Sequence, residues 1–334
     1  MTESQSSTGD ARVVPCERRS FLQRHPRRVP ITLFLAVFVI HAASPTPQTG
    51  DSRLSAITAW QFVREFNLHL ENYDVVQALA SRADIVEYNG HWLPYFPWPT
   101  MLLAAPMDFL LSLVGHGPTT LSISDPTRVW LVEIPTASAM VALTTVLVWS
   151  IVKNLPAAWA TDRVALITAL FFAFGTSAWS VGSRALWQQT ASMLMLTFIV
   201  FTIQRLESHR RWWWWALLFG VGSGLAVVCR PTNVIPVAAL WLLFAFRRPR
   251  GLPFAFLGAA VPLVPFLLIS QAQYGAALPP YAIAGPARRA GAPPPFGRTS
   301  PARPSATTGG PSRGQLGQPE ISAWSGRFRE ESPM

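Results

Sequence analysis

The chain has 334 residues, of which 50% are hydrophobic and only 13% are charged. Soluble globular domains carry about 25% charged residues, and here the deficit is concentrated in long apolar runs, as in membrane proteins. The net charge of +10 does not indicate nucleic-acid binding, because arginines gather between the apolar runs and near the C-terminus instead of forming a basic face with base-stacking aromatic residues. Composition therefore predicts an all-α membrane protein with no nucleic-acid partner.

Residues 1–28 are polar and end in a basic stretch that contains Arg18, Arg19, Arg24, Arg27 and Arg28. The apolar run Val29–Ala43 follows. It is short for a membrane span, since about 20 residues cross the hydrocarbon layer. Ala42-Ala43-Ser44 also resembles a signal-peptide cleavage site. Because the basic region is long and many apolar runs follow, we favour a retained signal anchor with a cytoplasmic N-terminal segment at 1–28.

Later apolar runs predict six further spans. They are Val129–Ile151, Val164–Val181, Leu186–Gln204, Trp212–Cys229, Thr232–Phe246 and Leu252–Gln271. Trp98–Val114 is apolar, but its sequence leaves open whether it crosses the membrane. The positive-inside rule decides between crossing and not crossing. If this segment does not cross, the basic residues between the later spans share the side of the N-terminal arginines. These residues are Lys153, Arg163, Arg205, Arg210, Arg211, Arg247, Arg248 and Arg250.

We therefore expect Trp98–Val114 to be re-entrant, juxtamembrane or a hairpin with both ends outside. The predicted fold class is a polytopic transmembrane helix bundle with about seven crossings, occupying residues 29–281. Its first extracytoplasmic loop, at about 44–128, is large and carries interfacial helices.

The outer loop is acidic and contains a candidate interfacial helix. Its apolar stripe has a spacing close to 3.6 residues and consists of Ala56, Ala59, Trp60, Val63, Phe66 and Leu70. Arg53, Gln61, Arg64 and Glu65 lie off this stripe. Such a helix is expected to lie flat at the lipid interface.

From about Gly285 the sequence becomes rich in Pro, Gly, Ser, Ala and Arg. It has almost no aliphatic periodicity, and such a segment buries too little apolar surface to become ordered. We expect residues 282–334 to form a disordered tail. One hypothesis for its origin is an out-of-frame translation or a C-terminal truncation.

No soluble-enzyme motif is present: the sequence lacks a P-loop, a dinucleotide glycine fingerprint after a strand and a metalloprotease helix motif. Gly220, Gly222 and Gly224 recur inside an apolar span. Glycines in such a place indicate close helix packing through small residues.

Asp51 is the candidate catalytic residue, in Thr49-Gly50-Asp51-Ser52. It follows the first span and precedes the interfacial helix, so its carboxylate is expected at headgroup depth. A carboxylate there could take a proton from a hydroxyl group or hold a divalent metal, Mg²⁺ or Mn²⁺, against a phosphate. The structural alternative is that Asp51 caps the N-terminus of a helix that begins at Ser52.

Arg184 and Arg230 are candidate phosphate-binding residues, because both are expected at outer ends of spans, against the positive-inside trend. Arginine near hydrocarbon is costly unless it snorkels or meets an anion. A phosphate matches the guanidinium fork. Snorkelling to headgroups or a pair with a loop carboxylate explains each arginine equally well.

His91 has no second ligand at metal spacing in the sequence, so a structural or sugar-contacting role is expected. Several aromatic residues nearby could stack on sugar rings, although aromatic residues are also common anchors at membrane interfaces. They are Tyr88, Trp92, Tyr95 and Trp98.

Four features resemble the multi-spanning GT-C glycosyltransferases, including the protein mannosyltransferase and aminoarabinose transferase type found in bacterial membranes. A short basic N-terminus and one span lead to Gly50-Asp51 at the start of a large outer loop, and an interfacial helix follows. The proline-bearing stretch Tyr95–Pro106 leads back toward the membrane. Ser183-Arg184-Ala185-Leu186-Trp187 and Arg230-Pro231-Thr232 are similar to loop-edge motifs of bacterial members. The resemblance covers about residues 25–281.

This resemblance implies an inverting transfer of sugar from a polyprenyl-phosphate donor to an acceptor on the extracytoplasmic face of a bacterial plasma (inner) membrane. It implies Asp51 as base or metal-associated acid. The expected partners are the lipid-linked donor and membrane lipids, with Arg184 and Arg230 on the donor phosphate, and with His91, Trp92 and Tyr95 contacting the sugar or the acceptor. Family members usually have more spans, and no tandem Asp pair follows the first span here.

Two other classes remain open: a transporter or flippase for lipid-linked sugars or other solutes, and a non-catalytic membrane subunit. Transporters place ionisable residues near the bilayer midplane on broken helices. The predicted spans are almost free of such residues, and the nearest one, Glu133, lies close to an outer end. This favours interfacial chemistry over a transport path.

Overall fold

The computed structural model describes residues 28–44, 52, 54–71, 73, 85–115, 129–156, 161–208 and 210–284. These residues are mainly helical, so the predicted all-α class is confirmed. By length and composition, three helical stretches in the described part of the chain are able to cross a membrane: Leu131–Lys153, Trp212–Cys229 and Pro249–Tyr274. Shorter apolar helices occupy Arg28–Ala42, Trp98–Leu113 and Pro231–Arg247. All but the first three residues of the predicted tail lie outside the described residues.

A helix occupies each of the seven predicted spans. The helices are α2 (Arg28–Ala42), α8 (Ile134–Lys153), α9 (Asp162–Gly175), α10 (Gln188–Ser208), α11 (Trp212–Cys229), α12 (Val234–Arg247) and α13 (Leu252–Tyr274). A π-helical turn, η2 (Val129–Glu133), directly precedes α8, and a second, η3 (Ala178–Gly182), follows α9 after the extended residue Thr176. How many of these helices cross the membrane stays a prediction.

Local sequence explains where several helices begin and end. The Thr161 hydroxyl caps α9 by accepting a hydrogen bond from the Val164 N–H at 3.2 Å. Helix α11 ends because Arg230 is extended (φ −150°, ψ 103°) and Pro231 has no N–H to continue the ladder. Gly275 closes α13 in the left-handed region (φ 65°) and donates its N–H to the Gln271 carbonyl.

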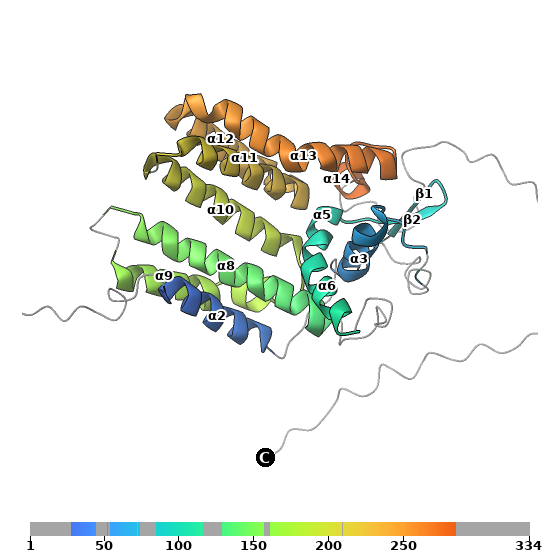
Figure 1. Cartoon of the computed structure of the whole chain (residues 1–334), viewed down its shortest axis with the longest axis horizontal. Helices are drawn as coiled ribbons and strands as arrows, with labels where there is room; N and C mark the ends of the chain where they lie inside the picture. Colours follow the sequence, from blue (N-terminus) through green and yellow to red (C-terminus); the bar gives the residue numbers. More distant parts are fainter. Residues whose placement is uncertain are drawn as a thin grey trace, which may run out of the picture. The chain divides into compact units, whose positions relative to one another are not determined.

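The helices form a bundle in which neighbours in sequence are mostly neighbours in space (Figure 1). Helix α8 contacts α2, α9 and α10, while α11 contacts α10 and α13. The α11–α13 contact is the most extensive. It depends on glycine: a Cβ at Gly220 would overlap the Ala255 carbonyl, and one at Gly258 would overlap the Leu217 carbonyl. The predicted close packing of the glycine-bearing span is therefore confirmed.

The two ends of the bundle differ in charge. At one end, Lys153 at the close of α8 pairs with Asp162 at the start of α9. Most other basic residues expected on the cytoplasmic side are exposed at this end, which we call the basic end. They are Arg163, Arg210, Arg211, Arg247, Arg248 and Arg250.

The opposite end, which we call the loop end, is formed by the C-termini of α2, α11 and α13 and the N-terminus of α8. His41 near the end of α2 packs edge-on against Trp179 in η3, with ring centroids 5.0 Å apart. Because α2 ends and α8 begins here, the outer loop leaves and re-enters the bundle at one end (Figure 1).

The ambiguous apolar segment lies across the loop end. It comprises α5 (Trp98–Met101), η1 (Leu102–Ala104) and α6 (Ala105–Leu113). At its start, the Trp98 indole donates to Ser270 Oγ near the end of α13 (3.4 Å), and the Thr100 hydroxyl donates to the carbonyl of Cys229, the last residue of α11 (2.9 Å). At its end, α6 contacts η2. Both ends of the segment therefore lie at the loop end, and whether the segment enters the membrane stays a prediction.

The outer loop also contains α3 (Ser55–Glu65) and a hairpin of β1 (Ile85–Tyr88) and β2 (His91–Pro94), paired antiparallel. Asn89 (φ 52°) and Gly90 (φ 84°) connect the strands, and two consecutive positive φ angles are typical of a hairpin turn. The hairpin was not predicted. Its base is fixed to the bundle by the Tyr274 hydroxyl, which donates to the Pro94 carbonyl at 2.9 Å.

Helix α3 was expected to turn an apolar stripe toward lipid, and only part of the stripe is free to do so. Val63 is 50% exposed and Phe66, beyond the end of the helix, is 78% exposed, whereas Ala56 and Ala59 are buried against protein. The buried face instead includes Ile57, Thr58 and Gln61. The reason is that α3 packs against α5, η1 and α6, so protein contacts select its buried face.

We expect Gly258→Leu to destabilise the bundle, because its side chain must displace the α11 backbone at Leu217. Overpacking of this kind costs about 1–3 kcal/mol. The measurement is the thermal unfolding midpoint of the protein purified in detergent. Val261→Leu, at a 59% exposed position of the same helix, is the matched control and should leave the midpoint unchanged. Equal midpoints for the two variants would contradict the close packing.

Candidate functional site at the loop end

Asp51, the predicted catalytic residue, lies outside the described residues. Ser52 is described and is buried, at 2% exposure. Its carbonyl accepts a hydrogen bond from the Ser55 N–H at 2.8 Å. The predicted helix start at Ser52 is wrong, because α3 begins at Ser55 with Leu54 at its N-cap and no side-chain cap. The catalytic role of Asp51 stays a prediction.

Arg184 lies in the turn between η3 and α10 and is only 3% exposed. Its guanidinium carbon stands 4.5 Å from the centre of the Trp179 ring. Nη1 is buried and meets no hydrogen-bond acceptor among the described residues. Burial lowers the pKa of Arg184, but arginine stays charged under all ordinary conditions. A buried cationic donor without an acceptor is costly, and the predicted role of Arg184 in binding a phosphate stays a prediction.

Three elements position Arg184. Trp179 in η3 contacts both the Arg184 guanidinium and the fully buried His41 of α2. The buried carboxylate of Glu133 accepts a hydrogen bond from the Leu186 N–H at 3.4 Å, just after the arginine. The Thr190 hydroxyl of α10 donates to the Gly182 carbonyl at 2.6 Å, just before it. The turn that carries Arg184 is therefore fixed on both sides.

Arg230 is half-buried between α11 and the short 3-10 turn η4 (Pro231–Asn233). Asn233, which is buried, donates through its side-chain amide to Ser192 Oγ and to the Ala226 carbonyl, both at 2.8 Å. The segment that carries Arg230 is thus tied to the first turns of α10, as is the Arg184 turn. Among the described residues, no hydrogen bond links the two arginines, so their joint action on one ligand stays a prediction.

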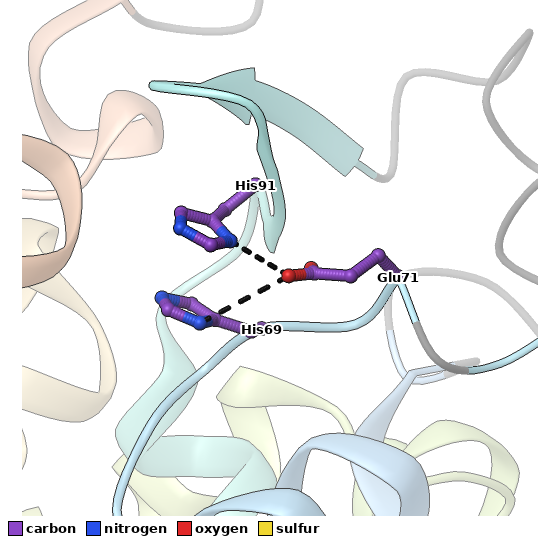
Figure 2. A group of neighbouring side chains, drawn as sticks. All are labelled: His69, Glu71 and His91. Carbon is purple, nitrogen blue, oxygen red and sulfur yellow. Dashed lines mark hydrogen bonds and ion pairs between the residues drawn. The ribbon is translucent and has the colours of Figure 1, made fainter.

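His91 lies in a cluster that the sequence spacing did not reveal. Its Nδ1 atom is 2.6 Å from Glu71 Oε1, and His69 Nδ1 is 4.0 Å from the same oxygen (Figure 2). The two imidazole rings stack with centroids 3.8 Å apart and an interplanar angle of 9°. One sequence signal for part of this cluster was available in His69-Leu70-Glu71. If such a segment is extended, residues two apart face the same side, so His69 and Glu71 could be expected to lie together.

Hydrogen bonding and burial set the charge state of this cluster. Burial lowers the pKa of His69, and the neighbouring His91 lowers it further. Glu71 acts in the opposite direction, but the pKa of His69 stays below its ordinary value. Burial alone would raise the pKa of Glu71, but hydrogen bonds from His91 and from backbone N–H groups bring it below its ordinary value. The cluster therefore contains an ionised carboxylate beside an imidazole that is neutral at pH 7.

The other two predicted sugar-contacting residues, Trp92 and Tyr95, pack against one apolar cluster that includes Leu70 and Phe96. The Trp92 N–H donates to Glu71 Oε2 at 3.4 Å, so the Trp92 backbone also contacts the histidine cluster. Tyr95 packs edge-on against Phe96 and against Tyr281 of α14 (Pro280–Ala284), at 5.3 and 6.0 Å between centroids. The two aromatic side chains are therefore brought together, next to the histidine cluster.

Apolar helices in a bundle, with a structured loop at one end, define an integral membrane protein. Residues 122–270 match the family model of the dolichyl-phosphate-mannose-protein mannosyltransferases. The match includes both Arg184 and Arg230, and it confirms the resemblance to GT-C-type membrane glycosyltransferases. No curated protein and no solved structure matches the chain.

We expect Asn233→Ala to destabilise the loop end, because it removes both hydrogen bonds that tie the Arg230 segment to α10 and to α11. Loss of these two buried hydrogen bonds is expected to lower the free energy of unfolding by about 1–2 kcal/mol. Thr232→Ala, at the exposed neighbouring position, is the control. Unfolding midpoints in detergent should fall for the first variant only, and a fall of equal size for both would refute the role of Asn233.

Proposed function

We propose that the chain transfers a sugar from a polyprenyl-phosphate donor to an acceptor on the extracytoplasmic face of a membrane. The family match over 122–270 carries this proposal, because it spans the segment that holds the buried Arg184. The guanidinium supplies a fixed, desolvated cation whose Nη1 has no acceptor among the described residues. A phosphate oxygen at the membrane interface would satisfy that donor.

The proposed reaction is a single displacement. The acceptor oxygen attacks the anomeric carbon of the sugar, and the bond from that carbon to the donor phosphate oxygen breaks. The acceptor proton passes to the Asp51 carboxylate, and polyprenyl phosphate leaves with the bonding electrons, so the configuration inverts. Arg184 stabilises the negative charge that grows on the phosphate. Arg230 contributes to donor binding, and His91, Trp92 and Tyr95 contact the sugar or the acceptor.

The charge pattern supports this orientation. Lys153 and most of the arginines between later spans gather at the basic end, and short basic loops favour the cytoplasm. The loop end, with Arg184 and the outer loop, then faces the extracytoplasmic side. We place the protein in a bacterial plasma membrane with a cytoplasmic N-terminus and with residues 29–281 as the transferase domain.

Sugar transfer by the purified full chain from a polyprenyl-phosphate sugar tests the function. We expect Asp51→Asn to lower kcat by about 10²–10⁴, the range for loss of a general base. Glu87→Gln, which changes an exposed carboxylate on β1, is the control and should retain activity. Equal rates for Asp51→Asn and wild type would remove Asp51 from the mechanism.

The same assay tests the phosphate site. Arg184→Lys keeps the charge but loses the guanidinium fork, and we expect it to raise the KM for the donor about tenfold or more, as loss of a charged hydrogen bond would. Arg64→Gln is the control, because Arg64 is exposed at the end of α3 and lies over the Trp60 ring. Solute uptake in proteoliposomes without sugar transfer would indicate a transporter instead.

A reporter that is active only outside the cytoplasm tests the orientation. Fused after Gly115, at the end of the segment that lies across the loop end, it should be active. Fused after Lys153, at the basic end, it should be silent. The reverse pattern would place Arg184 on the cytoplasmic face and exclude extracytoplasmic transfer.

A further inference from the structure

We propose that His69, Glu71 and His91 form a binding site for a divalent transition metal of the Zn²⁺ class. The site joins the segment after α3 to the β1–β2 hairpin in the outer loop. One ligand atom from each residue lies within 4.8 Å of the other two. Among the described residues no other group of three such side chains meets this distance.

The ligand types indicate which metal fits. Two imidazole nitrogens and one carboxylate oxygen are a donor set that suits zinc, with a fourth position left for water. Imidazole favours Zn²⁺ and its transition-metal neighbours, whereas Mg²⁺ and Mn²⁺ prefer all-oxygen sites. This site is therefore distinct from any Mg²⁺ or Mn²⁺ that Asp51 could hold at a donor phosphate.

The side chains already face one another. Figure 2 shows a nitrogen of each stacked ring directed at the Glu71 carboxylate. The distances of 2.6 and 4.0 Å to Glu71 Oε1 lie on either side of the separation between neighbouring ligands around a zinc ion. Small rotations of the two rings would equalise them. The side chains are 27–44% exposed, so an ion can reach them from solvent.

The backbone that carries the ligands is held by contacts independent of any metal. The Leu70 N–H, between His69 and Glu71, donates to the Trp92 carbonyl at 2.8 Å. The Leu68 N–H donates to Gln273 Oε1 at 3.4 Å, at the end of α13. Preorganised ligands lose little conformational freedom on binding. A bound ion would therefore cross-link two loop segments that are both anchored to α13.

Metal binding is measured on the full chain, purified in detergent through a tag without histidine and stripped with a chelator. Zn²⁺ affinity is determined by competition with a chromophoric chelator, and bound Co²⁺ is examined by visible absorption. We expect wild type to bind Zn²⁺ and to show the absorption bands of tetrahedral Co²⁺. We expect Zn²⁺ to raise the unfolding midpoint and EDTA to reverse the rise.

His69→Ala and His91→Ala should each weaken Zn²⁺ binding by more than about tenfold, since loss of a group that merely supports a ligand already costs 10–100-fold. Glu87→Gln, on the same hairpin, is the control that should bind like wild type. Unchanged Zn²⁺ affinity in both histidine variants, or an equal loss in the control, would overturn the proposal. No sugar donor is present, so failure here is distinct from failure of the transferase proposal.

Discussion

The close approach of α11 and α13 is the constraint on which the loop end depends. Gly220 and Gly258 let each helix backbone contact the other, where any side chain would overlap a carbonyl. Because lipid tails provide no hydrophobic drive between helices, such packing has to supply the association energy. The C-termini of both helices are thereby fixed, and they carry the anchors of the outer loop: the Cys229 carbonyl for Thr100, and Ser270 and Tyr274 for Trp98 and Pro94.

Charge then separates the two ends of the bundle. Solvated arginines gather at the basic end, while Arg184 at the other end is buried over Trp179. A buried guanidinium is costly in hydrocarbon, so its surroundings have to be fixed in place. Glu133, Gly182 and Thr190 provide the rigidity through hydrogen bonds around the turn. The donor phosphate of a glycosyltransferase would provide the anion.

The outer loop carries a second group of polar side chains, separate from the two arginines. Helix ends hold Arg184 and Arg230, whereas a turn-connected hairpin and an extended segment hold His69, Glu71 and His91. The histidine cluster depends on α13, because Leu68 and Pro94, on either side of the cluster, are hydrogen-bonded to residues near the end of that helix. Arg230 directly follows α11, whereas the Arg184 turn is held by Glu133 and by α10. A change at the α11–α13 contact is therefore expected to disturb the histidine cluster and Arg230 more than Arg184.

The sequence by itself determined the helices of the bundle, because each apolar run is continuous and its ends are marked by Pro, Gly or Arg, as at Arg230-Pro231 and Gly275. It also predicted the charge asymmetry and the close packing at Gly220. The dipeptide Asn89-Gly90 is a local sequence signal for the hairpin turn. Only the tertiary structure decided which face of α3 is buried and that His69 and Glu71 meet His91, 20 residues beyond Glu71. Local periodicity indicates which residues prefer to be buried. It does not indicate which residues they contact, because those contacts are selected by packing between segments far apart in the sequence.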